Sequence, residues 1–266
     1  MSPGEEFAWA VAGSRNGGDV EVAYRLALTE AFPLFKTRPR YTVRHLLKTA
    51  QVTGDGQVPY VHEAPPPRLE PSGTSYAETP ESAFASSVRM ADLTEVKVGV
   101  PVPKGVLDEP GLLAAFVDYR VLVRLSTVEN EILLHGSGDG AIDGLLHLAQ
   151  SRHAPFDGDP EEVLTAAAAE VEETGGSCDG IVTHPGLYWK LVRDGTLDRL
   201  ATAGIRVSRT RMIGTGDALL GDFRAAVTLL DPAQSTLRLR RDTEVIEAST
   251  RVGLAVHLPQ HFLLVS

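Results

Sequence analysis

Residues 91–136 read ADLTEVKVGVPVPKGVLDEPGLLAAFVDYRVLVRLSTVENEILLHG, and this stretch joins a predicted strand to a predicted long helix. In its first part, valines occupy every second position from Val96 to Val102, while the intervening residues are charged or small. A period of two places alternate side chains on opposite faces of a sheet. We therefore predict a strand over residues 95–102 with one valine face.

The helix that follows is long for a small domain. Asp108 is a suitable N-cap, Pro110 fits the first turn, and Gly136 fits the end. Between them, apolar residues recur at helical spacing: Leu112, Leu113, Phe116, Val117, Val121, Leu125, Val128 and Ile132. About 27 residues form a rod of roughly 40 Å. Because this exceeds the width of a compact small domain, we predict an elongated or plate-like molecule.

The segment before the helix, residues 59–103, contains many prolines and few large apolar side chains. It ends in the valine strand, so the chain makes an excursion and returns. This pattern predicts a projecting hairpin. Because the segment cannot build a core of its own, we expect contacts from outside the subunit to stabilise it.

The N-terminal part predicts an arm. Residues 1–18 are small and glycine-rich, and residues 19–32 show a short helical pattern that Pro33 stops. We interpret this part as an extended arm that carries one helix. The next segment, residues 41–50, predicts another helix capped by Thr42. Its apolar face would contain Val43, Leu46 and Leu47.

The second half of the chain mixes helices with strands. The segment of residues 159–176 indicates a helix, with Asp159 as its cap, Pro160 at its first position and Glu162 as the partner in a capping box. A strand follows at 179–185.

A helix over 186–195 then ends at Gly195, in keeping with the preference for glycine after a helix. Residues after 204 are mainly predicted strands. The class is therefore α+β in mixed order, and the sequence contains no internal repeat.

The composition narrows the range of functions. The chain has 266 residues, 43% of them hydrophobic, which is ample for a core, and a formal net charge of −10. A protein with this net charge has a mostly acidic surface, which repels a phosphate backbone. Nucleic acid is therefore not expected as a general partner. A single cysteine cannot form an internal disulfide, and the N-terminus lacks the pattern of a secretory leader. We expect a cytoplasmic protein with no membrane partner, because no apolar run approaches the roughly 20 residues of a membrane span.

The first candidate for chemistry is CDGIVTHPGLYW, residues 178–189, which contains the only cysteine, Cys178, and His184. A thiol and an imidazole must lie within about 3 Å to act together. If the run between them is extended, six residues separate them by roughly 20 Å. We therefore predict that Cys178 is a buried structural residue and that His184 begins a helix, while a small enzyme that uses this region remains a distant alternative.

Other candidate sites are weaker. The run GSGDGAIDG, residues 136–144, follows a helix and lacks the spacing of a phosphate-binding loop, so we predict a flexible connector. Asp157 and Asp159 lack the downstream ligands of a calcium loop. The eight histidines show no zinc pattern. The arginines are expected on solvated faces or in ion pairs between subunits, with an acidic ligand as the alternative: Arg206, Arg209, Arg211, Arg238, Arg240 and Arg241. We predict no catalytic residue, cofactor or metal.

The order of these motifs resembles the mature major capsid proteins of HK97-type tailed phages, a fold shared with bacterial encapsulin shells. The resemblance extends from about residue 33 to residue 266. The segments that carry it are TVRHLL with VPYVHEA, ADLTEVKVGVPVPKGVLDEP running into the long helix, ENEILLHGSGDGAIDGLL, GIVTHPGLYWKLVRDG and RVGLAVHLPQHFLLV.

The resemblance implies a division of the chain into five parts. They are an N-terminal arm (1–40), an arm-to-hairpin connection (41–58), an extended hairpin or E-loop (59–103), a peripheral domain with a spine helix (104–138 and 234–250), and an axial domain (139–233 and 251–266). In the family, axial domains meet at the vertices of the shell and hairpins lie over neighbouring subunits. Lys97 is the only lysine of this hairpin, and its register predicts no cross-link.

The implied function is structural and not enzymatic. The chain is expected to self-assemble, through pentamers with or without hexamers, into an icosahedral nanocompartment of encapsulin type that encloses a cargo protein. Its negative charge modestly favours protein cargo over DNA. The alternative is the major capsid protein of a phage or prophage, which would be found in a virion and would package DNA.

Overall fold

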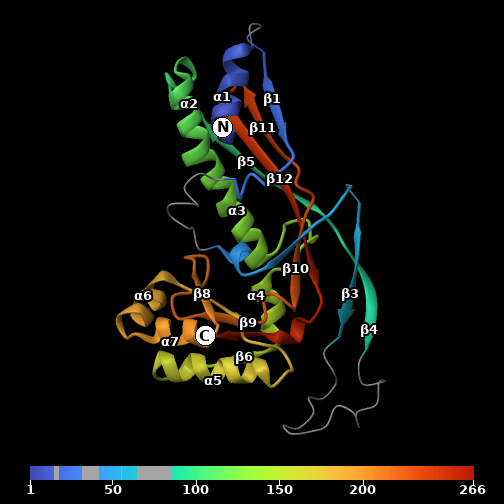
Figure 1. Cartoon of the computed structure of the whole chain (residues 1–266), viewed down its shortest axis with the longest axis vertical. Helices are drawn as coiled ribbons and strands as arrows, with labels where there is room; N and C mark the ends of the chain where they lie inside the picture. The colour runs from blue at the N-terminus through green and yellow to red at the C-terminus, as the bar shows by residue number, and fades with distance from the viewer. Residues whose placement is uncertain (15–17, 32–41, 55, 65–84) are drawn as a thin grey trace.

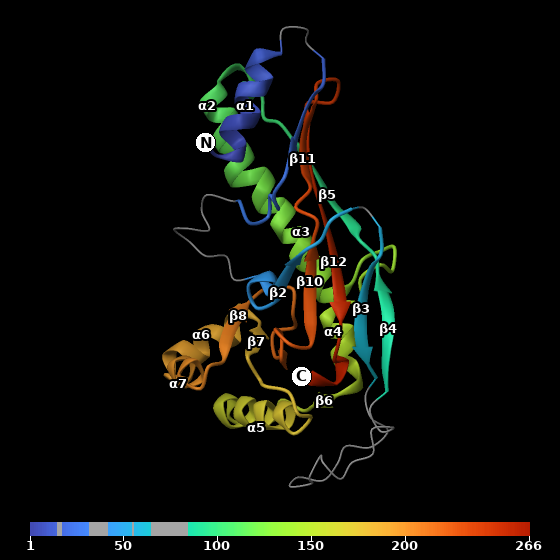
Figure 2. The same ribbon diagram turned by 45° about the vertical axis from the view of Figure 1, so that its right-hand side comes forward.

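The computed structural model describes residues 1–14, 18–31, 42–54, 56–64 and 85–266. The molecule is elongated: a helical rod and a long sheet form its upper part, and a smaller sheet with flanking helices forms its lower part (Figure 1). A separate two-stranded hairpin lies beside the large sheet (Figure 2). The predicted α+β class and elongated shape are confirmed.

The large sheet has six strands in the order β1-β11-β12-β10-β2, and β5 also pairs with β12. Only β2 and β10 are parallel neighbours. The strands are β1 (Val20–Tyr24), β2 (Lys48–Gln51), β5 (Thr94–Pro101), β10 (Val227–Asp231), β11 (Ser235–Arg240) and β12 (Val245–Val256). The predicted valine strand is confirmed as β5, in which Val96 and Val98 are buried.

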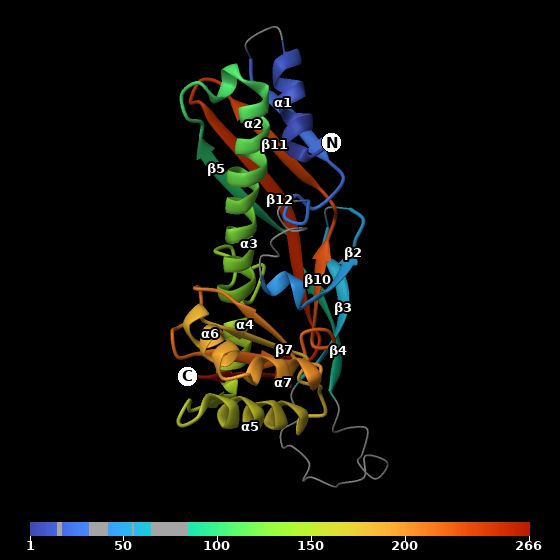
Figure 3. The same cartoon turned by 60° about the vertical axis from the view of Figure 1, so that its left-hand side comes forward.

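The rod is one continuous helix in three parts. These are α2 (Pro110–Phe116), a π-helical turn η6 (Val117–Val121) and α3 (Leu122–His135), with 7, 5 and 14 residues. Figure 3 shows α2 and α3 in line along the large sheet, with α1 beside α2 and the lower part at the end of α3. At ~1.5 Å per residue the rod is about 39 Å long, which confirms the predicted spine helix. The π-turn was not predicted.

The ends of the rod agree with the sequence except at the cap. Pro110 is the first helical residue, and Gly136 ends the helix with φ of +95°, which favours glycine. The N-cap is Glu109 instead of Asp108, because Asp108 closes a preceding 3-10 turn, η5 (Val106–Asp108). Leu112 is exposed, since the neighbouring Leu113 takes the buried position.

The arm differs from the expectation. Residues 1–18 contain the helix α1 (Pro3–Gly13), which begins with a capping box between Ser2 and Glu5 and buries Phe7 and Val11. The helix expected over residues 19–32 is wrong: β1 occupies its first part. The tertiary reason is that β1 pairs along its whole length with β11, which outweighs a weak local helical preference.

Helix α1 is fixed to the rod at the π-turn. The buried carboxylate of Asp118 accepts hydrogen bonds from Ser2 Oγ (2.5 Å) and from the backbone N–H of Gly4 (2.8 Å). Burial raises the pKa of Asp118, and these two bonds oppose the shift. A Cβ atom on Gly4 would lie 2.3 Å from the carbonyl oxygen of Ala114. The two helices can therefore approach this closely only with glycine at this position.

This contact predicts the effect of a small substitution. Gly4→Ala should lower the free energy of unfolding by about 1–3 kcal/mol, because overpacking forces α1 away from the rod. Thermal unfolding would measure the effect. Gly13→Ala is the matched control at the other end of α1, where a Cβ would meet nothing within 4 Å. Equal stability of the two variants would contradict the role assigned to Gly4.

The connection after the arm is also shorter than expected. The helix predicted over residues 41–50 is a single 3-10 turn, η2 (Val43–His45), followed by β2. The helix does not continue beyond this turn because the next residues form β2, which pairs in parallel with β10. The local sequence pattern does not reveal this pairing. The predicted apolar set is nevertheless buried: Val43, Leu46 and Leu47.

The smaller sheet has the strand order β6-β13-β9-β7-β8, with β8 at its edge. Its strands are β6 (His153–Ala154), β7 (Gly180–Thr183), β8 (Arg206–Arg209), β9 (Ala218–Gly221) and β13 (Phe262–Val265). The accompanying helices are α4 (Leu145–Leu148), η7 (Ala149–Ser151), α5 (Pro160–Glu172), α6 (Pro185–Arg193), α7 (Thr196–Thr202) and η8 (Pro259–His261). A second core, which includes Leu164, Ile181 and Leu263, joins α5 to this sheet.

Two predicted helices of this part are present. Helix α5 is capped by Asp159, whose carboxylate accepts a hydrogen bond from the backbone N–H of Glu161 at 2.9 Å. The predicted capping box with Glu162 does not form. Helix α6 is followed by Gly195, with φ of +72°, as the sequence predicted.

The hairpin consists of β3 (Val58–Glu63) and β4 (Ser86–Ala91), which pair antiparallel. The middle of the predicted excursion, residues 65–84, lies outside the described residues. The last part of the predicted excursion does not project, because β5 is a strand of the large sheet. We retain the five-part division of the chain as a proposal.

Candidate assembly surfaces

The hairpin presents an apolar face to solvent. Val61 lies directly opposite Val88, and Pro59 lies opposite Met90, so these four side chains share one face. The exposed fractions are 58% for Val61, 73% for Val88 and 49% for Met90. Clustered apolar exposure of this kind marks a candidate interaction surface. We call these four residues the hairpin face.

The opposite side of the hairpin is attached to the same subunit by two histidines. His62 is buried, and its Nδ1 bonds to the carbonyl oxygen of Val256 at 2.8 Å. His257 Nδ1 bonds to Val61 O at 2.8 Å, while its Nε2 lies 3.0 Å from Thr228 Oγ1. Because both contacts use imidazole hydrogen bonds to backbone, the hairpin face is held in a defined direction.

Further large apolar side chains lie exposed on helices. Those of the upper part are Trp9, Leu112 and Tyr119, and those of α6 are Trp189 and Val192. Trp189 contacts Tyr188 edge-on, and the guanidinium of Arg209 lies 4.1 Å from the centre of the Tyr188 ring. Aromatic side chains and arginine are more common at protein interfaces than on the rest of the protein surface.

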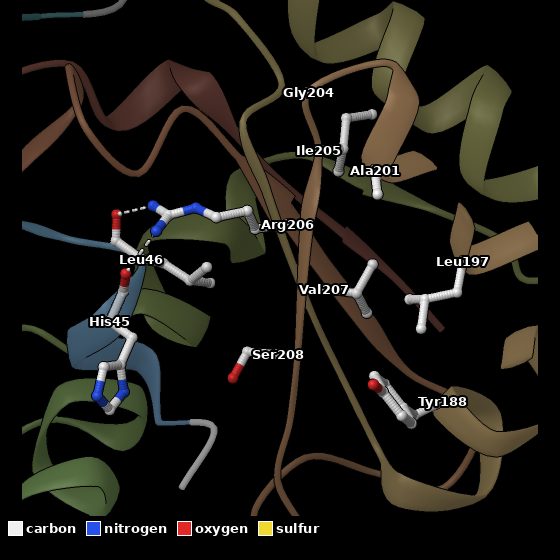
Figure 4. Close-up of a pocket in the computed structure, with 10 residues that line it drawn as sticks. All are labelled: His45, Leu46, Tyr188, Leu197, Ala201, Gly204, Ile205, Arg206, Val207 and Ser208. Atoms are coloured by element: carbon white, nitrogen blue, oxygen red, sulfur yellow. Dashed lines mark hydrogen bonds between the residues drawn. The ribbon is translucent and has the colours of Figure 1, made fainter. Parts of the chain in front are cut away.

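A groove of about 400 Å³ follows the edge strand β8. Figure 4 shows the ten residues that line it: His45, Leu46, Tyr188, Leu197, Ala201, Gly204, Ile205, Arg206, Val207 and Ser208. Arg206 donates to the carbonyl oxygens of His45 (3.0 Å) and Leu46 (3.2 Å), as the dashed lines mark. This arginine therefore joins the arm connection to the smaller sheet.

Cys178 and His184 are not arranged as a catalytic pair. Cys178 is buried, and burial raises the pKa of its thiol to about 12. His184 is the N-cap of α6, where its Nδ1 accepts a hydrogen bond from Gly186 N at 3.1 Å. The extended strand β7 lies between the two residues in the chain. The structural interpretation of both residues is confirmed.

The thiol is expected to be inert in the folded protein. At pH 8, a pKa of about 12 leaves roughly one thiolate in 10,000, whereas a free cysteine is about one-quarter ionised. Iodoacetamide should therefore modify native Cys178 at least about 100-fold more slowly than the urea-unfolded chain, measured by mass spectrometry. Equal rates would mean that the thiol is accessible and would reopen the enzyme hypothesis.

The glycine-rich run after the rod connects α3 to α4 as a hydrogen-bonded loop. Ser137 N donates to Ile142 O at 3.0 Å, and Asp139 accepts from Thr94 Oγ1 at 2.7 Å. Hydrogen bonds lower the pKa of Asp139 to about 2, and the bond with the Ser137 side chain has the largest effect. A Cβ on Gly144 would lie 2.3 Å from the backbone carbon of His135, so the loop closes tightly on the helix end.

The two aspartates considered for calcium lie at the start of α5. Asp159 caps α5, and Asp157 is exposed. Within the described part of the chain, no group of three or more His, Cys, Asp or Glu side chains could hold a metal ion. Nor is any helix described there both long and apolar enough to cross a membrane.

The arginines of the last strands form ion pairs within the subunit: Arg238 pairs with Asp19 at 3.0 Å, and Arg240 with Glu247 at 3.7 Å. Arg241 also bonds within the chain, since its Nε donates to Gly18 O at 3.0 Å.

A buried charge cluster was missed in the sequence. The guanidinium of Arg44 contacts Glu30 and Glu129, each at 2.8 Å, and Asp231 at 2.5 Å. Only Glu30 is substantially exposed. Thr29 Oγ1 also donates to Glu129 at 3.1 Å. A signal existed, because Glu129 lies four residues from both Leu125 and Leu133 and so occupies the apolar stripe of the rod.

Comparison with known proteins rests on structure alone. No family model matches the sequence, and no curated protein matches it. A solved chain from Mycobacterium phage Bobi has 14% identity and a TM-score of 0.61, with 85% of this chain and 90% of that chain covered. One from Microbacterium phage Oxtober96 has 16% identity and a TM-score of 0.60, with 84% and 90% covered.

A third similar structure is the capsid of a native gene transfer agent particle, with 15% identity, a TM-score of 0.60, and 86% of this chain and 96% of that chain covered. The chain therefore has the fold of HK97-type capsid proteins.

Proposed function

We propose that this chain is a structural subunit that assembles with copies of itself into a closed protein shell. The observation that carries the proposal is the likeness to solved phage and gene transfer agent structures over 84–86% of the chain. The hairpin face supports the proposal independently. Its apolar side chains are exposed to solvent, while the hydrogen bonds of His62 and His257 attach the hairpin to the rest of the subunit.

The proposal explains how modest surfaces could hold a large particle. In a closed symmetric assembly each subunit repeats the same contacts with several neighbours, so no single interface needs to be strong. The rigid rod would keep the hairpin and the smaller sheet at a set separation. Neighbouring subunits could then contact both regions in the same register.

The content of the shell separates two forms of this function. The similar structures come from phages and a gene transfer agent particle, which favours a shell around nucleic acid. The net charge of −10 favours a compartment around a protein, because an acidic lining repels phosphate. An encapsulin-like compartment and a phage capsid are therefore both retained, and no catalytic role is proposed for the subunit.

Expression of the full chain alone tests the proposal. Size-exclusion chromatography with negative-stain electron microscopy should show uniform hollow particles of megadalton mass. Absorbance at 260 and 280 nm after nuclease treatment would report protected nucleic acid, and mass spectrometry would report an enclosed protein. A discrete small oligomer that forms no particles, even with a co-expressed neighbouring gene product, would contradict the proposal.

A further inference from the structure

Helix α6 presents an aromatic knob whose orientation is fixed. Trp189 is 58% exposed, and Val192, three residues further along the same helix face, is 39% exposed. The indole contacts the Tyr188 ring edge-on, at 5.5 Å between ring centres, and the Arg209 guanidinium lies 5.0 Å from the indole centre. A side chain that is already held in place loses little conformational entropy on binding. We call Trp189 and Val192 the α6 knob.

A groove between α5 and α7 lies on another part of the subunit. Its volume is about 280 Å³, below the roughly 300–1,000 Å³ of small-molecule pockets, so it suits a single large side chain. The apolar lining consists of Ala168, Ala169, Leu200, Ala203 and Ile205. Figures 1 and 2 show α7 between α6 and α5, and neither residue of the α6 knob lines the groove. The knob and the groove are therefore two separate surfaces of one chain.

The two surfaces carry opposite charges. Helix α6 contains Lys190 and Arg193 and no acidic residue, whereas α5 contains four glutamates and no basic residue. Lys190 is exposed and directly follows Trp189. Glu172 is exposed and lines the groove. A knob that approaches this groove would therefore bring a cation to an anion at its edge.

We propose that the α6 knob of one subunit inserts into the α5–α7 groove of a second copy of this chain, with Lys190 facing Glu172. The inference rests on the proposed shell function and names surfaces that join neighbouring subunits. Aromatic side chains that fill a pocket on the partner contribute most of the binding energy of many interfaces. Because knob and groove are different patches, the contact is head-to-tail, and its repetition forms a ring where the rotation between subunits closes.

Sedimentation velocity of the full-length protein tests the contact. Trp189→Ala should raise the protein concentration needed for assembly at least about tenfold, because an aromatic anchor is lost. Trp189→Phe keeps an aromatic knob and is the matched control. Both variants should fold as the wild type does by circular dichroism, since this side chain is more than half exposed. Equal assembly of Trp189→Ala and the wild type would overturn the proposal.

A substitution in the groove should have the same effect. Ala169 is exposed and lines the groove, so Ala169→Trp fills the space that the knob would occupy. Ala166→Trp adds the same bulk at an exposed position of α5 outside the groove lining, and it should assemble as the wild type does. If Ala169→Trp assembled as readily as Ala166→Trp, the groove would not be the binding site.

A mixture of the two defective variants tests the head-to-tail arrangement. The Trp189→Ala subunit keeps its groove, and the Ala169→Trp subunit keeps its knob. At a concentration at which each variant alone remains unassembled, the mixture should form a dimer of one subunit of each kind. Absence of this dimer would contradict the insertion of the knob into the groove.

Charge reversal tests the pairing of Lys190 with Glu172. Lys190→Glu and Glu172→Lys should each weaken assembly, because like charges then face each other across the contact. The chain that carries both substitutions should assemble within about threefold of the wild-type concentration. A double variant that assembles no better than the single variants would refute this pairing.

The outcomes separate this contact from the shell itself. Normal particles of Trp189→Ala and Ala169→Trp would overturn the contact and leave the proposed shell intact. A small ring that depends on Trp189 and never forms a particle would support the contact and contradict the shell.

Discussion

Arg44→Met should lower the free energy of unfolding by about 3–5 kcal/mol. The guanidinium is the shared cation of Glu30, Glu129 and Asp231. Its removal leaves two buried carboxylates without a counter-charge, and breaking a buried ion pair from one side costs this much. Urea unfolding followed by circular dichroism would measure the loss.

The pH dependence of this loss has a definite sign. Burial raises the pKa of Glu129, and Arg44 opposes that shift. Without Arg44 the folded-state pKa rises further above the unfolded value of about 4.3, so the folded variant binds more protons in that window. The variant should therefore regain stability relative to the wild type as pH falls from 7 to 5. If the difference in unfolding free energy between variant and wild type stayed constant from pH 7 to 5, the pairing of Glu129 with Arg44 would be contradicted.

A double variant separates charge from packing. Arg44→Met combined with Glu129→Gln removes the cation and the more buried of its carboxylate partners together, so it should be more stable than Arg44→Met alone at pH 7. If packing of the arginine stem were the main contribution, the second substitution would restore nothing.

The elements that the sequence predicted well are those with strong local patterns. The valine strand and the rod could be predicted because alternation and helical spacing each extend over many residues, and Pro110 and Gly136 mark the ends of the rod. The role of His184 as a helix cap could be predicted from the proline that follows it.

The features that the sequence did not reveal depend on distant partners. Strand β1 is determined by pairing with β11, more than 200 residues away in the chain. The cluster around Arg44 joins residues from the arm, the rod and β10. Helix α1 is different, since the Ser2 and Glu5 capping pair is a local signal in the sequence that predicts the start of a helix.

Val88→Asp should abolish particle assembly while the subunit still folds. Val88 is 73% exposed and lies opposite Val61, so a carboxylate there meets solvent in the free subunit. In an assembled shell the same carboxylate would have to be desolvated at every copy of the interface, at several kcal/mol each. Because every subunit of the particle would bear this cost, the single substitution Val88→Asp should be enough to prevent assembly.

The control variant is Val88→Thr, which keeps a branched side chain of similar size and carries no charge. It should still form particles by size-exclusion chromatography and electron microscopy, at slightly higher protein concentration. The free Val88→Asp subunit should unfold within about 1 kcal/mol of the wild-type subunit, since β3 and β4 remain fixed through His62 and His257. Normal particles of Val88→Asp would show that the hairpin face remains in solvent after assembly, and assembly would then have to rest on the exposed helical residues of α1, α2 and α6.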